Sequence, residues 1–317
     1  MKLALAWTVG VIALLLIAAS ALLYTPDTDK QAMFVEYGAP PSRFVNLGAL
    51  TVHYRDEGPR DAPVIVLLHG SNSDLHTWDP WTKRLTAKYR VIRFDQIGHG
   101  LTGPSPTRDY RASAFVETVD RLTTQLGVKR FVLAGSSMGG WVAWEYARRH
   151  PGRLNGLVLI DAAGAPEDPN KQLPIGFRIA RTPVLSNLML WFTPRAVVAK
   201  SVHQTVSNQA VATPATIDRY WELLRYPGNR QATIDRFATP RVQVPRDQVA
   251  CIATRTLILW GAEDKLIPVA SAQWFKAALG NSQLIVYPGV GHLPMEEVAD
   301  RSESDLEGWL AGLPRLD

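Results

Sequence analysis

Short apolar segments alternate with amphipathic segments along most of the chain. The apolar segments are rich in Val, Ile and Leu and are bounded by glycine, proline or polar residues, which is typical of strands. They lie at residues 44–47, 50–55, 64–68, 91–94, 131–134, 154–160, 256–260 and 283–287. The amphipathic segments predict helices at residues 78–87, 112–126, 141–150, 270–279 and 296–310. This alternation predicts an α/β fold with a mostly parallel central sheet and helices on both faces.

The alternation stops between residues 164 and 250. This stretch has no strong strand pattern, contains many prolines, and includes several amphipathic helical pieces rich in Trp and Tyr. We interpret it as an inserted helical cap over the carboxyl-terminal edge of the sheet. The core would then consist of residues 44–163 and 251–317, preceded by a polar, proline-containing linker at residues 25–43.

The N-terminus is the most apolar part of the chain. Residues 3–23 contain no charged side chain, and a stretch of this length can cross the hydrocarbon core of a membrane as a helix. We therefore predict an uncleaved transmembrane anchor at residues 1–24, with the membrane as a partner. Because Lys2 precedes the stretch, the main domain is expected on the non-cytoplasmic side, periplasmic or extracellular. The alternatives are a cleaved signal and a secreted protein, or an apolar arm buried in the protein.

Composition narrows the class of partners. The net charge is +5, from 34 Lys+Arg against 29 Asp+Glu, and the basic residues form no block, so we expect no nucleic-acid partner. Cys251 is the single cysteine, which rules out an intrachain disulfide and a cysteine-based metal site. No His/Asp/Glu cluster has metal-ligand spacing and no glycine-rich loop would hold a dinucleotide, so we expect neither a metal nor a cofactor. The oligomeric state stays open.

The most specific chemical signal is the stretch Gly135-Ser136-Ser137-Met138-Gly139, which joins a predicted buried strand to a predicted helix. A serine held at such a sharp turn has a strained backbone. It leaves no room for side chains two residues before it and two residues after it, which explains the two glycines. We therefore predict that Ser137 is a nucleophile.

A nucleophilic serine needs a base within hydrogen-bond reach, and the base needs a group that orients it. Two later loops each follow a predicted strand and should leave the same edge of the sheet as Ser137. The first of these loops carries Asp264 and the second carries His292. The chain order Ser, Asp, His is the order described for nucleophiles at this kind of strand-to-helix turn.

Other residues compete for these roles. Glu263 neighbours Asp264 in the chain, and Asp161 ends a predicted strand at the same edge of the sheet, so both are alternatives for the acid. His69 and His99 lie in loops near this edge. We interpret both histidines as residues that stabilise their loops.

Together these motifs resemble those of the α/β-hydrolase family, in particular its branch of capped serine esterases and carbon–carbon-bond hydrolases with a G-x-S-M-G-G turn. The resemblance covers residues 44–313. It implies that Ser137 is the nucleophile, that His292 is the general base and later the acid, and that Asp264 orients the imidazole.

The resemblance also implies an oxyanion hole formed by the backbone N–H groups of Ser71 and Met138. Trp191 and Phe192 in the cap are expected to line the substrate pocket. The predicted function is a serine hydrolase that cleaves a small-molecule carboxylic ester through an acyl-enzyme. The alternatives are a carbon–carbon-bond hydrolase of the meta-cleavage-product type and a non-catalytic binding protein that keeps the hydrolase fold.

Overall fold

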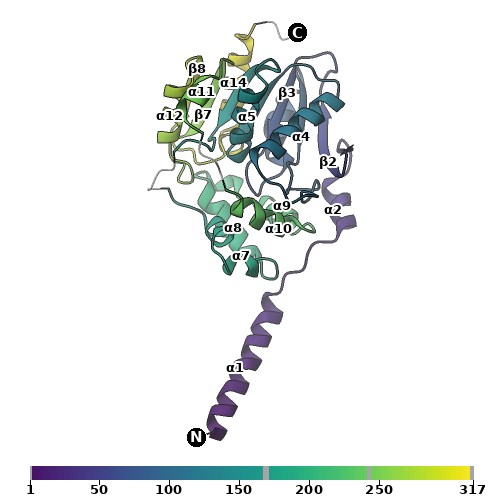
Figure 1. Cartoon of the computed structure of the whole chain (residues 1–317), viewed down its shortest axis with the longest axis vertical. Helices are drawn as coiled ribbons and strands as arrows, with labels where there is room; N and C mark the ends of the chain where they lie inside the picture. Colours follow the sequence, from purple (N-terminus) through teal and green to yellow (C-terminus); the bar gives the residue numbers. More distant parts are fainter. Residues whose placement is uncertain (1, 167–170, 241–243, 315–317) are drawn as a thin grey trace.

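A central sheet organises the molecule (Figure 1). The structure is a computed structural model that describes residues 2–166, 171–240 and 244–314, and within these residues the sheet has eight strands. The strands are β1 (Arg43–Leu47), β2 (Leu50–Glu57), β3 (Val64–Leu68), β4 (Arg90–Phe94), β5 (Phe131–Ser136), β6 (Leu154–Ile160), β7 (Thr256–Gly261) and β8 (Ser282–Tyr287). Their order in the sheet is β1-β2-β4-β3-β5-β6-β7-β8. β1 and β2 pair antiparallel with their neighbours, whereas β3 to β8 are parallel.

The central strands bury both of their faces. In β3, Ile65 and Leu67 belong to the core on one side of the sheet, while Val66 and Leu68 belong to the core on the other side. A strand buried on both faces needs apolar residues at every position, which is why these segments are continuous apolar runs in the sequence. The predicted fold class is confirmed, and the strand bounds differ from the predicted ones by at most two residues at either end.

Helices cover both faces of the sheet (Figure 1). One face carries α4 (Ala112–Gln125), α5 (Met138–Arg149) and α12 (Ala270–Ala278), and the other carries the 3₁₀ turn η1 (Leu75–Trp78), α3 (Asp79–Leu85), α13 (Pro294–Glu297) and α14 (Ala299–Ala311). The first face includes Phe115 and Trp144, and the second includes Trp81 and Trp309, all in the buried cores. The apolar faces of these helices therefore close the sheet on both sides.

The chain between β6 and β7 is helical in its described part. It contains α6 (Ile175–Arg181), α7 (Leu185–Leu188), α8 (Arg195–Thr205), η2 (Gln209–Val211), α9 (Pro214–Leu224), α10 (Asn229–Ala238) and α11 (Arg246–Ala250). α7 to α10 lie together beyond the edge of the sheet, on the side from which α1 projects (Figure 1). α11 lies instead against α5 and α12. The division into a core at residues 44–163 and 251–317 and a cap at residues 164–250 stays a prediction.

The N-terminal region contains helices α1 (Lys2–Leu23) and α2 (Lys30–Tyr37). α1 extends away from the rest of the protein (Figure 1), and the side chains of α1 that the structure describes are exposed, so α1 is not an arm buried in the protein. α2 lies inside the stretch that we predicted as a linker. The Asp29 carboxylate accepts a hydrogen bond from the Ala32 N–H at 2.8 Å and caps this helix, a signal that the linker interpretation overlooked.

The prediction of a membrane anchor is wrong. A helix needs about 20 consecutive, predominantly apolar residues to cross a membrane. Across the described part of the chain, no helix has the length and apolarity that a crossing requires. The transmembrane segment at residues 1–24, the membrane partner and the location derived from them are therefore withdrawn.

Candidate active site

Ser137 lies between β5 and α5 with a strained backbone. Its φ is 55° and its ψ is −115°, in a region that residues other than glycine rarely adopt. The Ser137 N–H donates to the Ile160 carbonyl at 2.9 Å, and the Ser137 carbonyl accepts from the Ala163 N–H at 2.9 Å. These bonds to the end of β6 and the residues after it hold the turn in place, and Ser137 remains 8% exposed.

The glycines around Ser137 are required by close backbone contacts. A Cβ atom on Gly135 would lie 2.2 Å from the Gly139 carbonyl oxygen, and a Cβ atom on Gly139 would lie 2.2 Å from the Leu68 carbonyl oxygen. Real Cβ atoms essentially never approach this closely. The spacing of glycines around the serine is therefore a packing requirement between β5, α5 and the end of β3.

Asp264 and His292 are in direct contact. Asp264 follows β7 and His292 follows β8, and these strands are neighbours in the sheet. The His292 Nδ1 and the Asp264 Oδ2 are 2.6 Å apart, and both residues are buried. The Asp264 Oδ1 accepts hydrogen bonds from the N–H groups of Leu266 at 2.8 Å and Ile267 at 3.0 Å. These donors fix the carboxylate, which in turn orients the imidazole.

The other ring nitrogen of His292, Nε2, is the atom that could act as the base for Ser137. Both residues line the same cavity. The His292 Nε2 is buried and makes no hydrogen bond to any described group, so the hydrogen bond to the Ser137 hydroxyl is not formed in this structure. Hydrogen bonds of this kind are often long in proteins without substrate and tighten when substrate binds.

Asp161 lies beside this pair, whereas Glu263 does not. Glu263 is exposed to solvent. Asp161 is fully buried at the end of β6, and its Oδ1 accepts a hydrogen bond from the Gly261 N–H at 3.0 Å. Burial, together with the neighbouring Asp264 charge, raises the pKa of Asp161 well above its usual value. Asp264 accepts hydrogen bonds from two backbone N–H groups and contacts the imidazole, whereas Asp161 accepts one backbone N–H, so Asp264 is the carboxylate that orients His292.

His69 and His99 make contacts that stabilise the loops around them. The His69 Nε2 accepts a hydrogen bond from the Gln96 N–H at 2.9 Å, and the His69 Nδ1 lies 2.7 Å from the Gly70 carbonyl oxygen. The His69 and His99 rings pack edge to face with their centroids 5.0 Å apart. Burial lowers the pKa of both imidazoles, so both are neutral near pH 7. Their contacts join the loops after β3 and β4.

One group of described side chains has the residue types of a metal site. Asp161, Asp264 and His292 each place one oxygen or nitrogen atom within 4.8 Å of the others. The direct contact of 2.6 Å between the His292 Nδ1 and the Asp264 Oδ2 is a hydrogen bond. An ion bound between those two atoms would need about 2.0–2.2 Å to each of them. The geometry of this group therefore fits an oriented imidazole better than a metal centre.

The loop after β3 contacts Ser137 closely. A Cβ atom on Gly70 would lie 3.2 Å from the Ser137 Cβ, so only a small residue fits there easily. Ser71 lines the cavity next to Ser137, and Asn72 has a positive φ of 57°. Met138 begins α5, so its N–H is among the first groups of the helix and lacks a partner one turn earlier. The predicted oxyanion donors thus lie on the two segments nearest to Ser137.

Sequence reasoning missed Arg236. This residue of α10 is 3% exposed, and its Nη1 donates to the Ser71 Oγ at 2.6 Å while its Nη2 donates to the Asn72 Oδ1 at 2.6 Å. The Nη1 also lies 3.6 Å from the Met138 sulfur. An arginine in an amphipathic helix resembles any solvent-facing residue in sequence. The only signal was that Thr233 and Arg236 share one face of α10.

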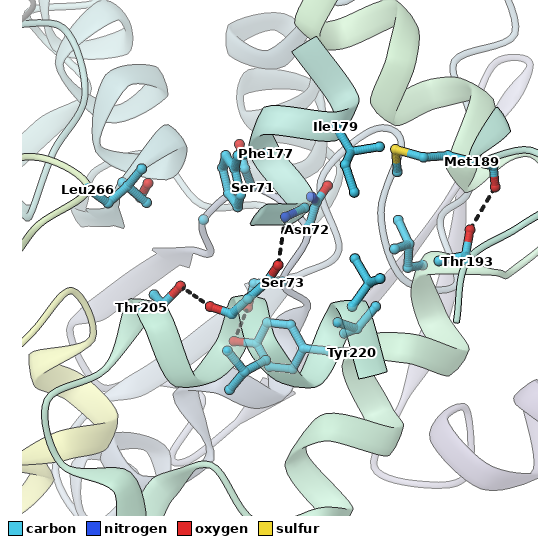
Figure 2. Close-up of a pocket in the computed structure, with 18 of the residues that line it drawn as sticks. Ser71, Asn72, Ser73, Phe177, Ile179, Met189, Thr193, Thr205, Tyr220 and Leu266 are labelled. Atoms are coloured by element: carbon cyan, nitrogen blue, oxygen red, sulfur yellow. Dashed lines mark hydrogen bonds between the residues drawn. The ribbon is translucent and has the colours of Figure 1, made fainter. Parts of the chain in front are cut away.

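Two cavities meet at Ser137. The first is about 330 Å³ and its walls are mainly apolar side chains of the helical segment (Figure 2). The second is about 660 Å³ and extends toward α5 and the loop after β7. Ser71, Ser137, Phe177 and Leu266 line both of them.

Of the two predicted pocket residues, Phe192 lies at a cavity and Trp191 does not. Phe192 lines the first cavity. Trp191 lines neither cavity among the described residues; it is 56% exposed and stacks on Tyr24, with ring centroids 6.3 Å apart. Adjacent residues in an irregular segment point in different directions, and only the packing around them shows which one points inward.

Comparison with known proteins places this arrangement in a family. Residues 63–298, well over half of the chain, match the family described as alpha/beta hydrolase fold. The chain belongs to this family. It is accordingly a hydrolase of α/β fold, and the match includes Ser137, Asp264 and His292.

Relatives of this hydrolase are named for different reactions. The cis-3-alkyl-4-alkyloxetan-2-one decarboxylase of Xanthomonas campestris is 27% identical over 283 residues, which cover 82% of this chain and 92% of the relative. The 2-hydroxy-6-oxononadienedioate/2-hydroxy-6-oxononatrienedioate hydrolase 2 of Pseudomonas putida is 27% identical over 281 residues, which cover 83% and 93%. The crystal structure of a membrane phospholipase A, a bacterial virulence factor, is similar with a TM-score of 0.74 at 25% identity and covers 98% of this chain and 99% of that protein.

Proposed function

We propose that this α/β hydrolase is a serine esterase that cleaves carboxylic esters through an acyl-enzyme. The observation that carries the proposal is the buried Asp264–His292 pair, which shares a cavity with the strained Ser137 and whose second ring nitrogen makes no hydrogen bond to a described group. The carboxylate would select the tautomer with the proton on Nδ1. The Nε2 atom is then the base that a serine hydroxyl requires.

The reaction would proceed in two halves. The Ser137 Oγ attacks the ester carbonyl carbon and gives its proton to the His292 Nε2, while the carbonyl oxygen becomes an oxyanion held by the backbone N–H groups of Ser71 and Met138. The tetrahedral intermediate then collapses, and the leaving alcohol takes the proton from His292. In the second half, His292 takes a proton from water, and the hydroxide attacks the acyl-enzyme. The acid leaves, and the proton returns to Ser137.

The two cavities suggest an ester with two sizeable halves. The walls of the first cavity include Ile179, Met189 and Val198, so a hydrocarbon acyl chain would bury its surface there at about 0.8 kcal/mol for each CH₂ group. The second cavity would hold the alcohol part. The likeness to a phospholipase A at 25% identity supports a lipid-like ester as the substrate.

A second candidate is a hydrolase of carbon–carbon bonds. The Pseudomonas putida relative has a name that describes a dicarboxylic, vinylogous diketone substrate. The described lining of the second cavity includes Lys171 and Arg181, and cationic side chains suit such a substrate. The described lining of the first cavity contains no lysine or arginine, which favours a hydrocarbon chain and therefore the ester.

Hydrolysis of p-nitrophenyl esters of increasing acyl length by the full chain tests the proposal. We expect turnover that disappears in Ser137→Ala, and labelling of Ser137 by a fluorophosphonate probe. A folded wild-type protein that neither turns over these esters nor reacts with the probe would refute the esterase. Turnover of a meta-cleavage diketone in place of the esters would select the second candidate.

A further inference from the structure

The loop that carries one expected oxyanion donor is held by the helical segment between β6 and β7. We call residues 70–72 the oxyanion loop. Its Asn72 has a left-handed backbone, which costs energy for a residue with a side chain and persists only when the surroundings fix it. The Asn72 Oδ1 accepts hydrogen bonds from the Arg236 Nη2 at 2.6 Å and from the Thr233 Oγ1 at 3.2 Å. Both donors come from α10.

Arg236 connects both sides of the expected oxyanion site. Its guanidinium donates to Ser71 and Asn72 of the oxyanion loop and contacts the sulfur of Met138. Ser71 and Met138 are the two residues whose N–H groups are expected to hold the oxyanion. A planar guanidinium with several donors in fixed directions can fix several acceptors at once, which lysine cannot do as well.

The charge of Arg236 acts on nearby groups. The side chain is nearly fully buried, where Coulomb interactions are stronger than in water. Burial lowers the pKa of His99, and the Arg236 charge lowers it further. A positive charge at this position would also favour the negative oxygen of a tetrahedral intermediate more than the neutral carbonyl of the substrate.

α10 itself is attached firmly to the core. The Asn229 Nδ2 in its first turn donates to the Gly100 carbonyl at 3.0 Å. Near its other end, Asp235 accepts two hydrogen bonds from Arg108, at 2.6 and 2.7 Å. Both ends of α10 are thus attached to the loop after β4, mainly through the buried Asn229, and this attachment positions Arg236 on the core.

We propose that Arg236 is a positioning residue of this hydrolase: it fixes the oxyanion loop from α10 and places a buried positive charge beside the oxyanion. The inference rests on the proposed esterase function. It means that the oxyanion site is complete only while α10 is docked on the core, so that helix and chemistry are coupled through one side chain.

The test compares Arg236→Met with Arg230→Met in the full chain. Arg230 is also buried in α10, but it contacts Thr25, Asp27 and Met189 and makes none of the bonds to the oxyanion loop. With the best p-nitrophenyl ester, we expect Arg236→Met to lower kcat about 10- to 100-fold with little change in KM. We expect Arg230→Met to keep kcat within about threefold of the wild type. Equal kcat values for the two variants would overturn the proposal.

Further variants separate position from folding. Arg236→Lys keeps the charge and should recover at least about a third of the kcat lost in Arg236→Met, whereas no recovery would contradict the role of the charge. Asn72→Gly keeps the left-handed backbone but removes the group that Arg236 holds, so it should lower kcat even if Arg236→Met does not fold. An unchanged kcat in Asn72→Gly would also overturn the proposal.

If the esterase proposal itself is wrong, the experiments give a different result from the one expected when only the inference on Arg236 is wrong. In that case the wild type itself shows no Ser137-dependent turnover and no labelling by a fluorophosphonate. If only the inference on Arg236 is wrong, the wild type is active and Arg236→Met matches Arg230→Met. A boronic acid that mimics the tetrahedral intermediate gives an independent measure, because Arg236→Met should weaken its binding about as much as it lowers kcat.

Discussion

The sheet and the helical segment between β6 and β7 are stabilised in different ways. Every residue of β5 and β7 is buried, and the apolar side chains of these strands pack under helices on both faces. In α8 the buried residues are Val198 and Val202, and much of the remaining inner surface borders the first cavity. Ion pairs join this segment to the rest of the chain, for example Arg219 with Asp74 at 3.1 Å.

This difference separates two parts of the reaction. The loops after β5, β7 and β8 carry Ser137, Asp264 and His292, so close packing of the sheet controls the geometry of the reacting groups. The helical segment supplies most of the walls of the first cavity. We therefore expect substitutions in the sheet loops to change the rate for all substrates. Substitutions of helix residues that line the first cavity should change which substrate is preferred, whereas substitution of Arg236 in α10 should act on the rate through the oxyanion loop.

Ser137→Ala should have the largest effect. Without the hydroxyl no acyl-enzyme forms, and kcat should fall about 10⁶-fold for every acyl length. Ester turnover across the chain-length series measures this, with circular dichroism to confirm the fold. Residual activity that keeps the wild-type chain-length profile would show that the hydrolysis does not depend on Ser137.

Asp264→Asn should lower kcat about 10⁴-fold, because an amide no longer selects the tautomer of His292 with a proton on Nδ1. The matched control is Glu263→Gln, which alters an exposed carboxylate one residue away and should retain activity within about threefold. Steady-state kinetics of both variants at several pH values provides the comparison. Similar losses in the two variants would mean that the effect comes from the loop and not from the contact with His292.

Val198→Phe should change the preference for acyl-chain length and leave the turnover of short esters unchanged. Val198 lines the first cavity, so a phenyl ring there would exclude part of a long acyl chain from it. Each excluded CH₂ group costs about 0.8 kcal/mol, which is about a fourfold loss in kcat/KM for long esters. The control is Ala196→Phe, which adds the same ring at an exposed position of α8. A uniform loss for short and long esters would contradict the assignment of this cavity to the acyl chain.

Asp161→Asn should have the smallest of these effects, a change in how the stability of the protein depends on pH. The pKa of Asp161 is raised well above its usual value in the folded protein, whereas it is about 3.9 in the unfolded chain. Above pH 4 the folded state therefore binds the extra proton, and stability falls as the pH rises toward the folded pKa. The asparagine variant loses this penalty, so its Tm relative to the wild type should rise by about 2 °C between pH 5 and 8. A constant difference in Tm would show that Asp161 is ionised in both states.

Local patterns in the sequence determined much of this protein. Continuous apolar runs identified the strands, because strands buried on both faces need apolar residues at every position. The glycines at 135 and 139 identified the turn at Ser137, because their close contacts to neighbouring backbone leave no room for a Cβ atom. The order of the loops after the strands indicated Asp264 and His292. These features depend on the few residues around each position or on the general rule for the edge of a parallel sheet.

Only the tertiary structure decided the features that depend on how distant segments pack. Arg236 reaches the oxyanion loop across more than 160 positions of sequence, and apart from the face that it shares with Thr233 its place in α10 is that of an arginine in solvent. Phe192 points into a cavity while its neighbour Trp191 stacks on Tyr24, because the surrounding helices set their directions. The cavities themselves are spaces between helices whose sequences specify only which faces are apolar. Hydrophobic periodicity predicts an element, but contacts between elements decide what each side chain touches.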